Sequence, residues 1–73
     1  YMSREEDELK FFTNIRRFRE RRGQNLEELA EESGVSLDML EQLEQNILPK
    51  EMMVDDACRL AKALHCKIHE LFK

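Results

Sequence analysis

His65, Cys66 and His69, near the C-terminus, are residue types that bind transition metals. The two histidines lie four residues apart, a spacing that can hold zinc on one face of a helix. A structural zinc site needs four ligands, however, and Cys66, like Cys58, falls at a position that the helical pattern makes apolar. We therefore expect two buried free thiols and no metal site.

This sequence contains no recognisable catalytic motif. There is no glycine-rich phosphate loop and no nucleophile elbow, and a helical bundle of 73 residues has little room for a deep pocket. We expect no enzymatic activity, no catalytic residue and no cofactor. No run approaches the roughly 18 apolar residues of a membrane span, so we expect a cytoplasmic protein without a membrane partner.

The charges are separated along the chain, which bears on nucleic-acid binding. Residues 10–22 include six basic residues and one acidic residue, a net charge of +5, whereas residues 27–56 include ten acidic residues and Lys50 alone, a net charge of −9. Proteins gain sequence-independent affinity for DNA by neutralising phosphates, so the overall charge of −4 opposes tight binding. The basic segment is the candidate phosphate-binding side, and Glu31, Glu32, Asp55 and Asp56 are expected to be solvated surface.

Residues 26–45 have the pattern of two short helices joined by a tight turn. Asn25 and Glu28 can form a capping box that starts the first helix, and Gly34 permits the left-handed backbone that ends it. Ser36 can cap the second helix. The apolar side of that helix consists of Leu37, Leu40 and Leu43. This is the pattern of a helix-turn-helix, whose second helix can project into a DNA major groove.

Further helices are expected on both sides of this motif. A long first helix could start near Arg4, with Ser3 and Glu6 as its capping box, and extend to about residue 22. Its buried side is predicted to comprise Leu9, Phe11, Phe12, Ile15 and Phe18. A fourth helix is marked by Val54, Ala57, Cys58, Ala61 and Leu64, and a short fifth helix by Ile68, Leu71 and Phe72.

Landmarks of a known family recur in order and at the family's spacing. They are Ile15, Arg16, Arg17, Phe18 and Arg19 with Gly23; Glu27, Glu28, Leu29 and Ala30; Gly34, Val35 and Ser36; Leu43 and Glu44; Leu60, Ala61, Lys62, Ala63 and Leu64; and Glu70, Leu71 and Phe72. Through them, residues 15–72 resemble the DNA-binding domains of the phage repressor and Cro type, the xenobiotic-response-element family of bacterial transcriptional regulators.

The resemblance implies a fold for the chain and the bounds of its segments. The chain is expected to be an all-α, five-helix, lambda-repressor-like domain spanning residues 1–73, with an N-terminal extension at residues 1–11 and the helix-turn-helix motif at residues 26–45. The extension could pack against a second subunit or form a frayed arm. We favour packing, because Leu9, Phe11 and Phe12 are costly to leave in water. Asn46 and His65 stand at positions that the family usually gives to glycine.

The resemblance also implies which residues of the second motif helix, called here the reading helix, face the DNA. They are Ser36, Leu37, Asp38, Glu41 and Gln42. Gln42 is the best base reader, since glutamine can pair bidentately with adenine. Glu41 or Asp38 could accept a hydrogen bond from cytosine N4, and Leu37 could meet a thymine methyl group or equally belong to the core or a dimer surface.

Contacts to the DNA backbone are expected from residues around the reading helix. Arg19 and Glu44 have the separation of a family ion pair that links the first helix to the end of the reading helix, so Arg19 is expected to be mainly structural. Asn25 can offer its amide to a phosphate, whereas Leu26 replaces a glutamine that commonly does so. The remaining candidates are Arg16, Arg17, Arg22 and Lys50 for phosphates, and Gln45 and Asn46 for neutral contacts.

Two functions from different classes are compatible with these residues. The first is a sequence-specific regulator of the repressor/Cro type that binds double-stranded DNA in the major groove as a homodimer. The second is a degenerate helix-turn-helix that serves as a protein–protein interaction module for a protein partner. We favour the first, because the caps, the turn and Gln42 are intact and the first helix is basic. The acidic reading helix and Leu26 weigh against it.

Overall fold

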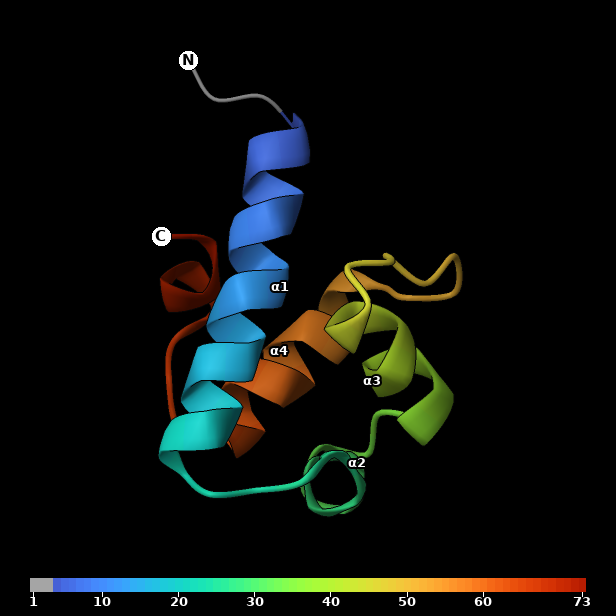
Figure 1. Cartoon of the computed structure of the whole chain (residues 1–73), viewed down its shortest axis with the longest axis vertical. Coiled ribbons are helices and arrows are strands. Elements are labelled where there is room, and N and C mark those ends of the chain that lie inside the picture. Colours follow the sequence, from blue (N-terminus) through green and yellow to red (C-terminus); the bar gives the residue numbers. More distant parts are fainter. Residues whose placement is uncertain (1–3) are drawn as a thin grey trace.

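The computed structural model describes residues 4–73, with side chains from Asp7 onward. Within this range the chain forms α1 (Arg4–Arg21), α2 (Leu26–Ser33), α3 (Leu37–Glu44), α4 (Val54–Ala63) and a C-terminal 3-10 helix, η1 (Ile68–Phe72), and no strand (Figure 1). The predicted all-α fold with an extended first helix is therefore confirmed, although the fifth helix is a 3-10 helix. The predicted capping box of Ser3 with Glu6 lies outside the described residues.

The ends of the two motif helices coincide with the predicted caps. Asn25 Oδ1 accepts a hydrogen bond from the Glu28 backbone N–H at 2.8 Å, and Glu28 Oε1 accepts one from the Asn25 N–H at 3.1 Å. Ser36 Oγ accepts the Met39 N–H at 3.2 Å at the start of α3. Gly34 ends α2 with a φ of 77°, the left-handed conformation that other residues adopt at a cost of roughly 1–2 kcal/mol.

Left-handed backbone also occurs at the two positions that the family usually gives to glycine. Asn46 has a φ of 61° after α3, and His65 has a φ of 58° after α4. Each turn is closed by backbone hydrogen bonds, from the Asn46 N–H to Leu43 O at 3.0 Å and from the His65 N–H to Lys62 O at 3.1 Å. Both helix ends therefore adopt the left-handed conformation without a glycine.

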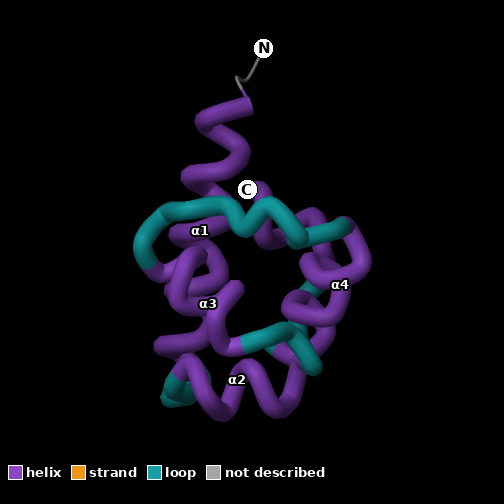
Figure 2. Tube along the Cα trace, turned by 90° about the vertical axis from the view of Figure 1, so that its right-hand side faces the viewer, coloured by secondary structure: helices purple, strands orange, loops and turns teal. Residues whose placement is uncertain are grey.

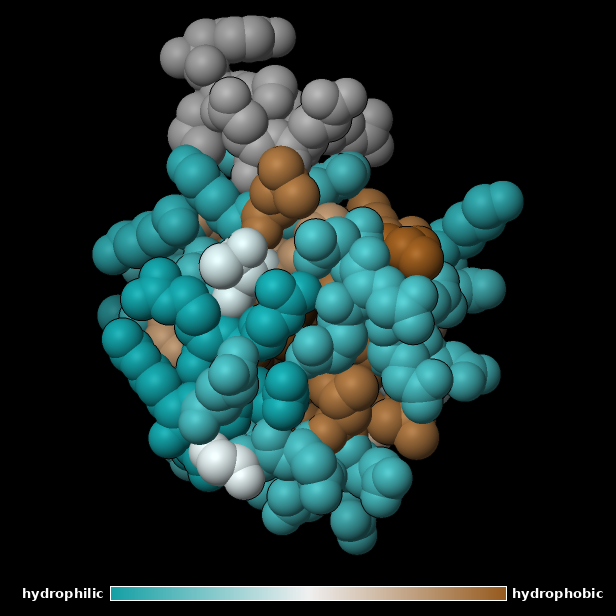
Figure 3. Space-filling view, in the orientation of Figure 1, coloured by the Kyte–Doolittle hydropathy of each residue, from teal (hydrophilic) through white to brown (hydrophobic). Residues whose placement is uncertain are grey.

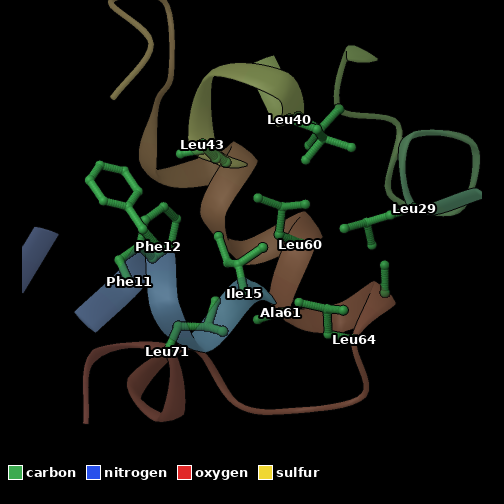
Figure 4. Close-up of a cluster of buried hydrophobic side chains, with 12 residues drawn as sticks. Phe11, Phe12, Ile15, Leu29, Leu40, Leu43, Leu60, Ala61, Leu64 and Leu71 are labelled. Carbon is green, nitrogen blue, oxygen red and sulfur yellow. The ribbon is translucent and has the colours of Figure 1, made fainter. Parts of the chain in front are cut away.

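Every helix of the bundle contributes to the core, which takes leucines from α2, α3, α4 and η1, and two phenylalanines and an isoleucine from α1. In Figure 4, Leu60 of α4 lies among Leu29 of α2, Leu40 of α3 and Ile15 of α1, and all four side chains are at most 3% exposed. Leu71 of η1 is fully buried below α1. Because α2 and α3 both pack onto this cluster, the position of the motif depends on the whole bundle.

The N-terminal part of α1 agrees with prediction at two of its three large apolar residues. Phe11 and Phe12 are buried as predicted, at 3% and 4% exposed, and the Phe11 ring stacks on that of Phe72 with centroids 5.1 Å apart. Because the chain's own bundle buries both phenylalanines, they do not need a second subunit to cover them. Leu9 was predicted to be buried but is 54% exposed. Figure 1 shows that the N-terminal part of α1 projects beyond the rest of the bundle.

Fewer residues of the two C-terminal helices are buried than the sequence pattern indicated. In α4 the fully buried residues begin at Leu60, and Cys58 is exposed, so its predicted burial is wrong; Val54, which marks the start of the helix, is 77% exposed. Both residues precede the fully buried part of α4. In η1 only Leu71 is fully buried, while Ile68 and Phe72 are 36% and 40% exposed.

Both cysteines are free thiols, as predicted, but their surroundings differ. Cys66 is half-buried against the core, and this burial, with a smaller contribution from the Glu70 carboxylate, raises the pKa of its thiol. A raised pKa lowers the thiolate fraction and hence the reactivity of Cys66 at neutral pH. No three His, Cys, Asp or Glu side chains among the described residues are grouped so as to hold a metal ion. Within the same residues, no helix has both the length and the apolar character needed to cross a bilayer.

Candidate nucleic-acid interface

The reading helix, α3, has one face anchored in the core and one at the surface. Leu40 and Leu43 are 1% and 2% exposed and fix the inner face. The outer residues Ser36, Asp38 and Glu41 are exposed, and Leu37 and Gln42 are half-buried. Figure 2 shows α3 toward the viewer with α2 below it, the arrangement of a helix-turn-helix. The outer face of α3 is therefore held by the core and accessible to a partner.

The turn that joins α2 to α3 is held by its own hydrogen bonds. The Gly34 N–H donates to Ala30 O at 2.9 Å, and the Val35 N–H donates to Ser33 Oγ at 3.1 Å. Val35 is 2% exposed, as expected of a side chain that fills the space under the turn. The short turn and the buried valine together fix the angle between the two motif helices.

An ion pair links α1 to the end of α3, as predicted. Arg19 Nη2 and Nε lie 2.7 Å and 3.0 Å from Glu44 Oε1, and Arg19 Nη1 donates to the Gln24 backbone oxygen at 2.8 Å. The side chain of Arg19 is only 17% exposed, so Glu44 compensates a charge that is largely withdrawn from water. Arg19 is thus a structural residue that positions the reading helix.

Arg16 joins the same carboxylate, which sequence reasoning did not anticipate. Arg16 Nε lies 3.4 Å from Glu44 Oε2, and Arg16 Nη2 donates to Glu44 O at 2.9 Å and to Asn46 Oδ1 at 3.1 Å. A cation at the C-terminus of a helix interacts favourably with the helix dipole. We call Arg16, Arg19 and Glu44 the Glu44 cluster; its two cations share one carboxylate, so it keeps a net charge of +1 beside the end of α3.

The other two arginines expected to contact phosphates occupy different places. Arg22 Nε donates to Gln24 Oε1 at 3.2 Å, and Arg22 Nη2 lies 3.8 Å from Glu32 Oε2, so its charge is partly compensated. Arg17 is exposed and lines a hollow beside η1 together with Asn14, Phe18, Arg21, Glu70 and Lys73. Successive helical residues point about 100° apart, so Arg17 faces away from the side of α1 that holds the Glu44 cluster. This position does not support a phosphate contact beside α3.

Polar groups that could contact a DNA backbone lie at both ends of the motif. Asn25 is exposed, and its Oδ1 is used in the cap while its amide NH2 stays available. Leu26, at the position where the family commonly has glutamine, is half-buried against the core. After α3, Gln45, Asn46 and Lys50 are exposed.

Two carboxylates dominate the charge on the outer face of α3. Asp38 and Glu41 are both exposed, and neither forms an ion pair with any residue that the structure describes. The described ion pairs of this helix are those of the Glu44 cluster, at its C-terminal end. Negative charge therefore stands at the middle of the reading surface, with positive charge at its edge.

One comparison identifies a family for this arrangement. A family model described as Cro/C1-type HTH DNA-binding domain matches residues 14–73, which include α2, α3, α4, η1 and the second half of α1. No curated protein and no solved structure gives a significant match to the chain.

Proposed function

We propose a function for this chain from its family: the chain belongs to the Cro/C1-type HTH DNA-binding domains. It is a DNA-binding regulator, and we infer that it acts as a sequence-specific regulator of the repressor/Cro type that binds a two-fold site in double-stranded DNA as a homodimer. The observation that carries this proposal is the outer face of α3, which is anchored from below by Leu40 and Leu43 and exposed at Ser36, Asp38 and Glu41.

Base reading is assigned to the middle of α3. Gln42 has an amide that can donate to N7 and accept from N6 of adenine, and Glu41 and Asp38 can accept from cytosine N4. Leu37 is half-buried, so it can support the helix and still present its end to a thymine methyl group. In this proposal the two carboxylates select cytosine-containing steps and disfavour binding elsewhere, because an unpaired carboxylate is repelled by phosphates.

Backbone contacts are assigned to both ends of the motif. At the start of α2, the Asn25 amide and the free N–H groups of the first helical turn can bind one phosphate. At the end of α3, Gln45, Asn46 and the net positive Glu44 cluster can bind another. These contacts hold residues 26–45 across a groove while Gln42 reads a base.

The proposal is tested by selecting binding sites from random DNA duplexes at low and moderate salt. We expect an enriched motif with two-fold symmetry. The affinity for that motif should fall by roughly 10²-fold between 50 and 200 mM salt if about four phosphates are contacted. If no motif is enriched and no complex forms at low salt, the DNA-reading proposal is wrong for this chain.

Replacing Gln42 with alanine should relax the preference for one base pair of the selected motif. A bidentate glutamine–adenine contact contributes about 1–3 kcal/mol of discrimination, or roughly 5- to 150-fold. Fluorescence anisotropy with the selected duplex and single-base variants measures this change. Gln45→Ala is the matched control, because it removes the same amide from the end of α3 and should weaken all duplexes alike. An unchanged base preference in Gln42→Ala would refute the assignment.

A protein-interaction role is the second candidate, and one observation favours it. Asp38 and Glu41 leave the reading surface negative at its centre, which suits a basic partner surface better than a phosphate backbone. The two functions predict opposite effects of Asp38→Asn and Glu41→Gln. Loss of these charges should raise non-specific affinity for DNA, whereas it should weaken binding to a basic protein partner.

A further inference from the structure

Large apolar side chains are concentrated on the outside of the connection between α3 and α4. Ile47, Leu48, Met53 and Val54 are 49%, 43%, 70% and 77% exposed, and they make up four of the seven exposed large hydrophobic residues among those described. We call these four residues the loop patch. Figure 3 shows hydrophobic atoms on the right of the molecule, where Figure 1 draws this connection.

The exposure of the loop patch does not arise from a poorly anchored loop. Pro49 is buried and Met52 is half-buried against the core, so the connection has inward-facing residues of its own. The Met52 N–H donates to Pro49 O at 3.2 Å, and the Ile47 N–H donates to Gln42 O at 2.8 Å. The loop is therefore fixed against the bundle with an apolar outer side.

The start of α4 gives independent support, because Met53 occupies its N-cap position. Side chains that accept a hydrogen bond, such as serine and aspartate, are strongly preferred there, and apolar residues are among the poorest. Only half of the cap is made by a side chain, with Asp56 Oδ2 accepting the Met53 N–H at 2.9 Å. Folding of the single chain thus does not explain a 70% exposed methionine at this position.

We propose that the loop patch is the face through which two copies of this chain meet when they bind DNA; this rests on the proposed function. On a two-fold site the reading helices lie about one helical turn, roughly 34 Å, apart. The contact between subunits must then lie beside α3, and the connection that bears the loop patch continues directly from the end of α3. No other described element joins an exposed apolar surface to the reading helix.

Charge around the loop patch is self-complementary, as an interface between identical copies requires. Lys50 is exposed and forms no ion pair with a described residue, and the exposed carboxylates of Glu51 and Asp55 lie close to it in the sequence. A two-fold axis through the loop patch brings Lys50 of each copy to the carboxylates of the other. The acidic surroundings are then partly neutralised on both sides.

The size of the loop patch sets how strong this contact is. Four side chains exposed to this degree offer a few hundred Å² of apolar surface, whereas a stable interface buries about 800 Å² on each partner. The dimer is therefore weak in free solution and forms on DNA, where binding to adjacent half-sites gives the two copies a high effective concentration.

The experiment compares binding to a single half-site and to the full two-fold site selected above. For the native chain, we expect the second copy to bind the full site at least tenfold more tightly than a lone half-site. Val54→Gln should leave half-site affinity within twofold and abolish this cooperativity; glutamine adds no charge that would repel DNA. Leu9→Gln is the matched control, since Leu9 is 54% exposed on a different element, and it should leave cooperativity unchanged.

A second variant separates association from folding. Met53→Ser supplies the missing N-cap, so its melting temperature should rise by a few degrees. Its cooperativity on the full site should nevertheless fall tenfold or more. A variant that is more stable and less cooperative cannot be explained by damage to the fold. Unchanged cooperativity in both Val54→Gln and Met53→Ser, or its loss in Leu9→Gln, would overturn the proposed dimer face.

Failure of the proposed function is distinguishable from failure of this inference. If the native chain binds neither the full site nor a half-site, the DNA-reading proposal fails. Sedimentation equilibrium up to millimolar concentration then tests the loop patch directly. If the chain self-associates, and Val54→Gln abolishes this association while Leu9→Gln preserves it, the loop patch is supported as the interface between copies. Absence of self-association, or association insensitive to Val54→Gln, would reject it.

Discussion

Leu40→Ala should lower the free energy of unfolding by about 2–5 kcal/mol. Leu40 is 1% exposed on the inner face of α3 and lies beside Leu60 in the core (Figure 4), so truncation removes apolar contact and leaves a cavity. A domain of this size has roughly 5 kcal/mol of stability in total. We therefore expect a variant that is partly unfolded at room temperature, measured by urea denaturation followed by circular dichroism.

Leu37→Ala is the matched control for this prediction. It makes the same substitution one turn earlier in α3, at a half-buried position. Since much of the Leu37 side chain is already in contact with water, its loss should cost about 1 kcal/mol or less. Equal destabilisation by the two variants would mean that α3 is not seated on the core by its Leu40 face. If Leu37→Ala stays folded as expected, a weaker complex with DNA would indicate that Leu37 contacts the DNA.

Local chemistry explains why the helix ends could be predicted from the sequence. A capping box needs only Asn25 and Glu28, three residues apart, and a left-handed turn needs only the backbone freedom of Gly34 or the tolerance of Asn46. Each signal acts within one turn of helix. Such signals are independent of how distant elements pack, and the structure bears them out.

Burial was harder to predict, because it depends on which distant element covers a residue and where that element ends. Phe11 is buried because Phe72, far along the chain, stacks on it, whereas Leu9 lies beyond the covered length of α1. Val54 and Cys58 share an apolar spacing with Ala61, but full burial in α4 begins only at Leu60. Helical periodicity identifies a face and does not say how much of its length is covered.

The contacts that position α3 were only partly visible in the sequence. The Arg19–Glu44 pair could be predicted because it resembles an ion pair of the family, but nothing in the sequence singled out Arg16 as the second arginine on Glu44. Asn14 was also missed: it is 7% exposed, and its Nδ2 donates to the Leu71 backbone oxygen at 2.9 Å, tying α1 to η1. An asparagine within the apolar stripe of a helix is the signal that could have revealed it.

Glu44→Gln should destabilise the fold by about 1–3 kcal/mol, the range for a hydrogen-bonded charge pair that is only partly buried. The change leaves Arg19, 17% exposed, and Arg16, 35% exposed, without a counter-charge. For a domain of this length the melting temperature should fall by roughly 5–20 °C, which thermal denaturation measures. Glu41→Gln is the matched control: Glu41 is exposed, and its loss should change stability by less than about 0.5 kcal/mol.

The same pair of variants separates two contributions to DNA affinity. Each removes one negative charge from α3, so long-range repulsion from phosphates falls by a similar amount in both. Glu44→Gln additionally raises the net charge of the Glu44 cluster from +1 to +2 and frees two guanidinium groups to bind phosphates. At a temperature where both variants are folded, Glu44→Gln should therefore gain more non-specific affinity and a steeper salt dependence than Glu41→Gln. Equal gains would show that Arg16 and Arg19 stay on the α3 backbone and Gln24, and act only as structural residues.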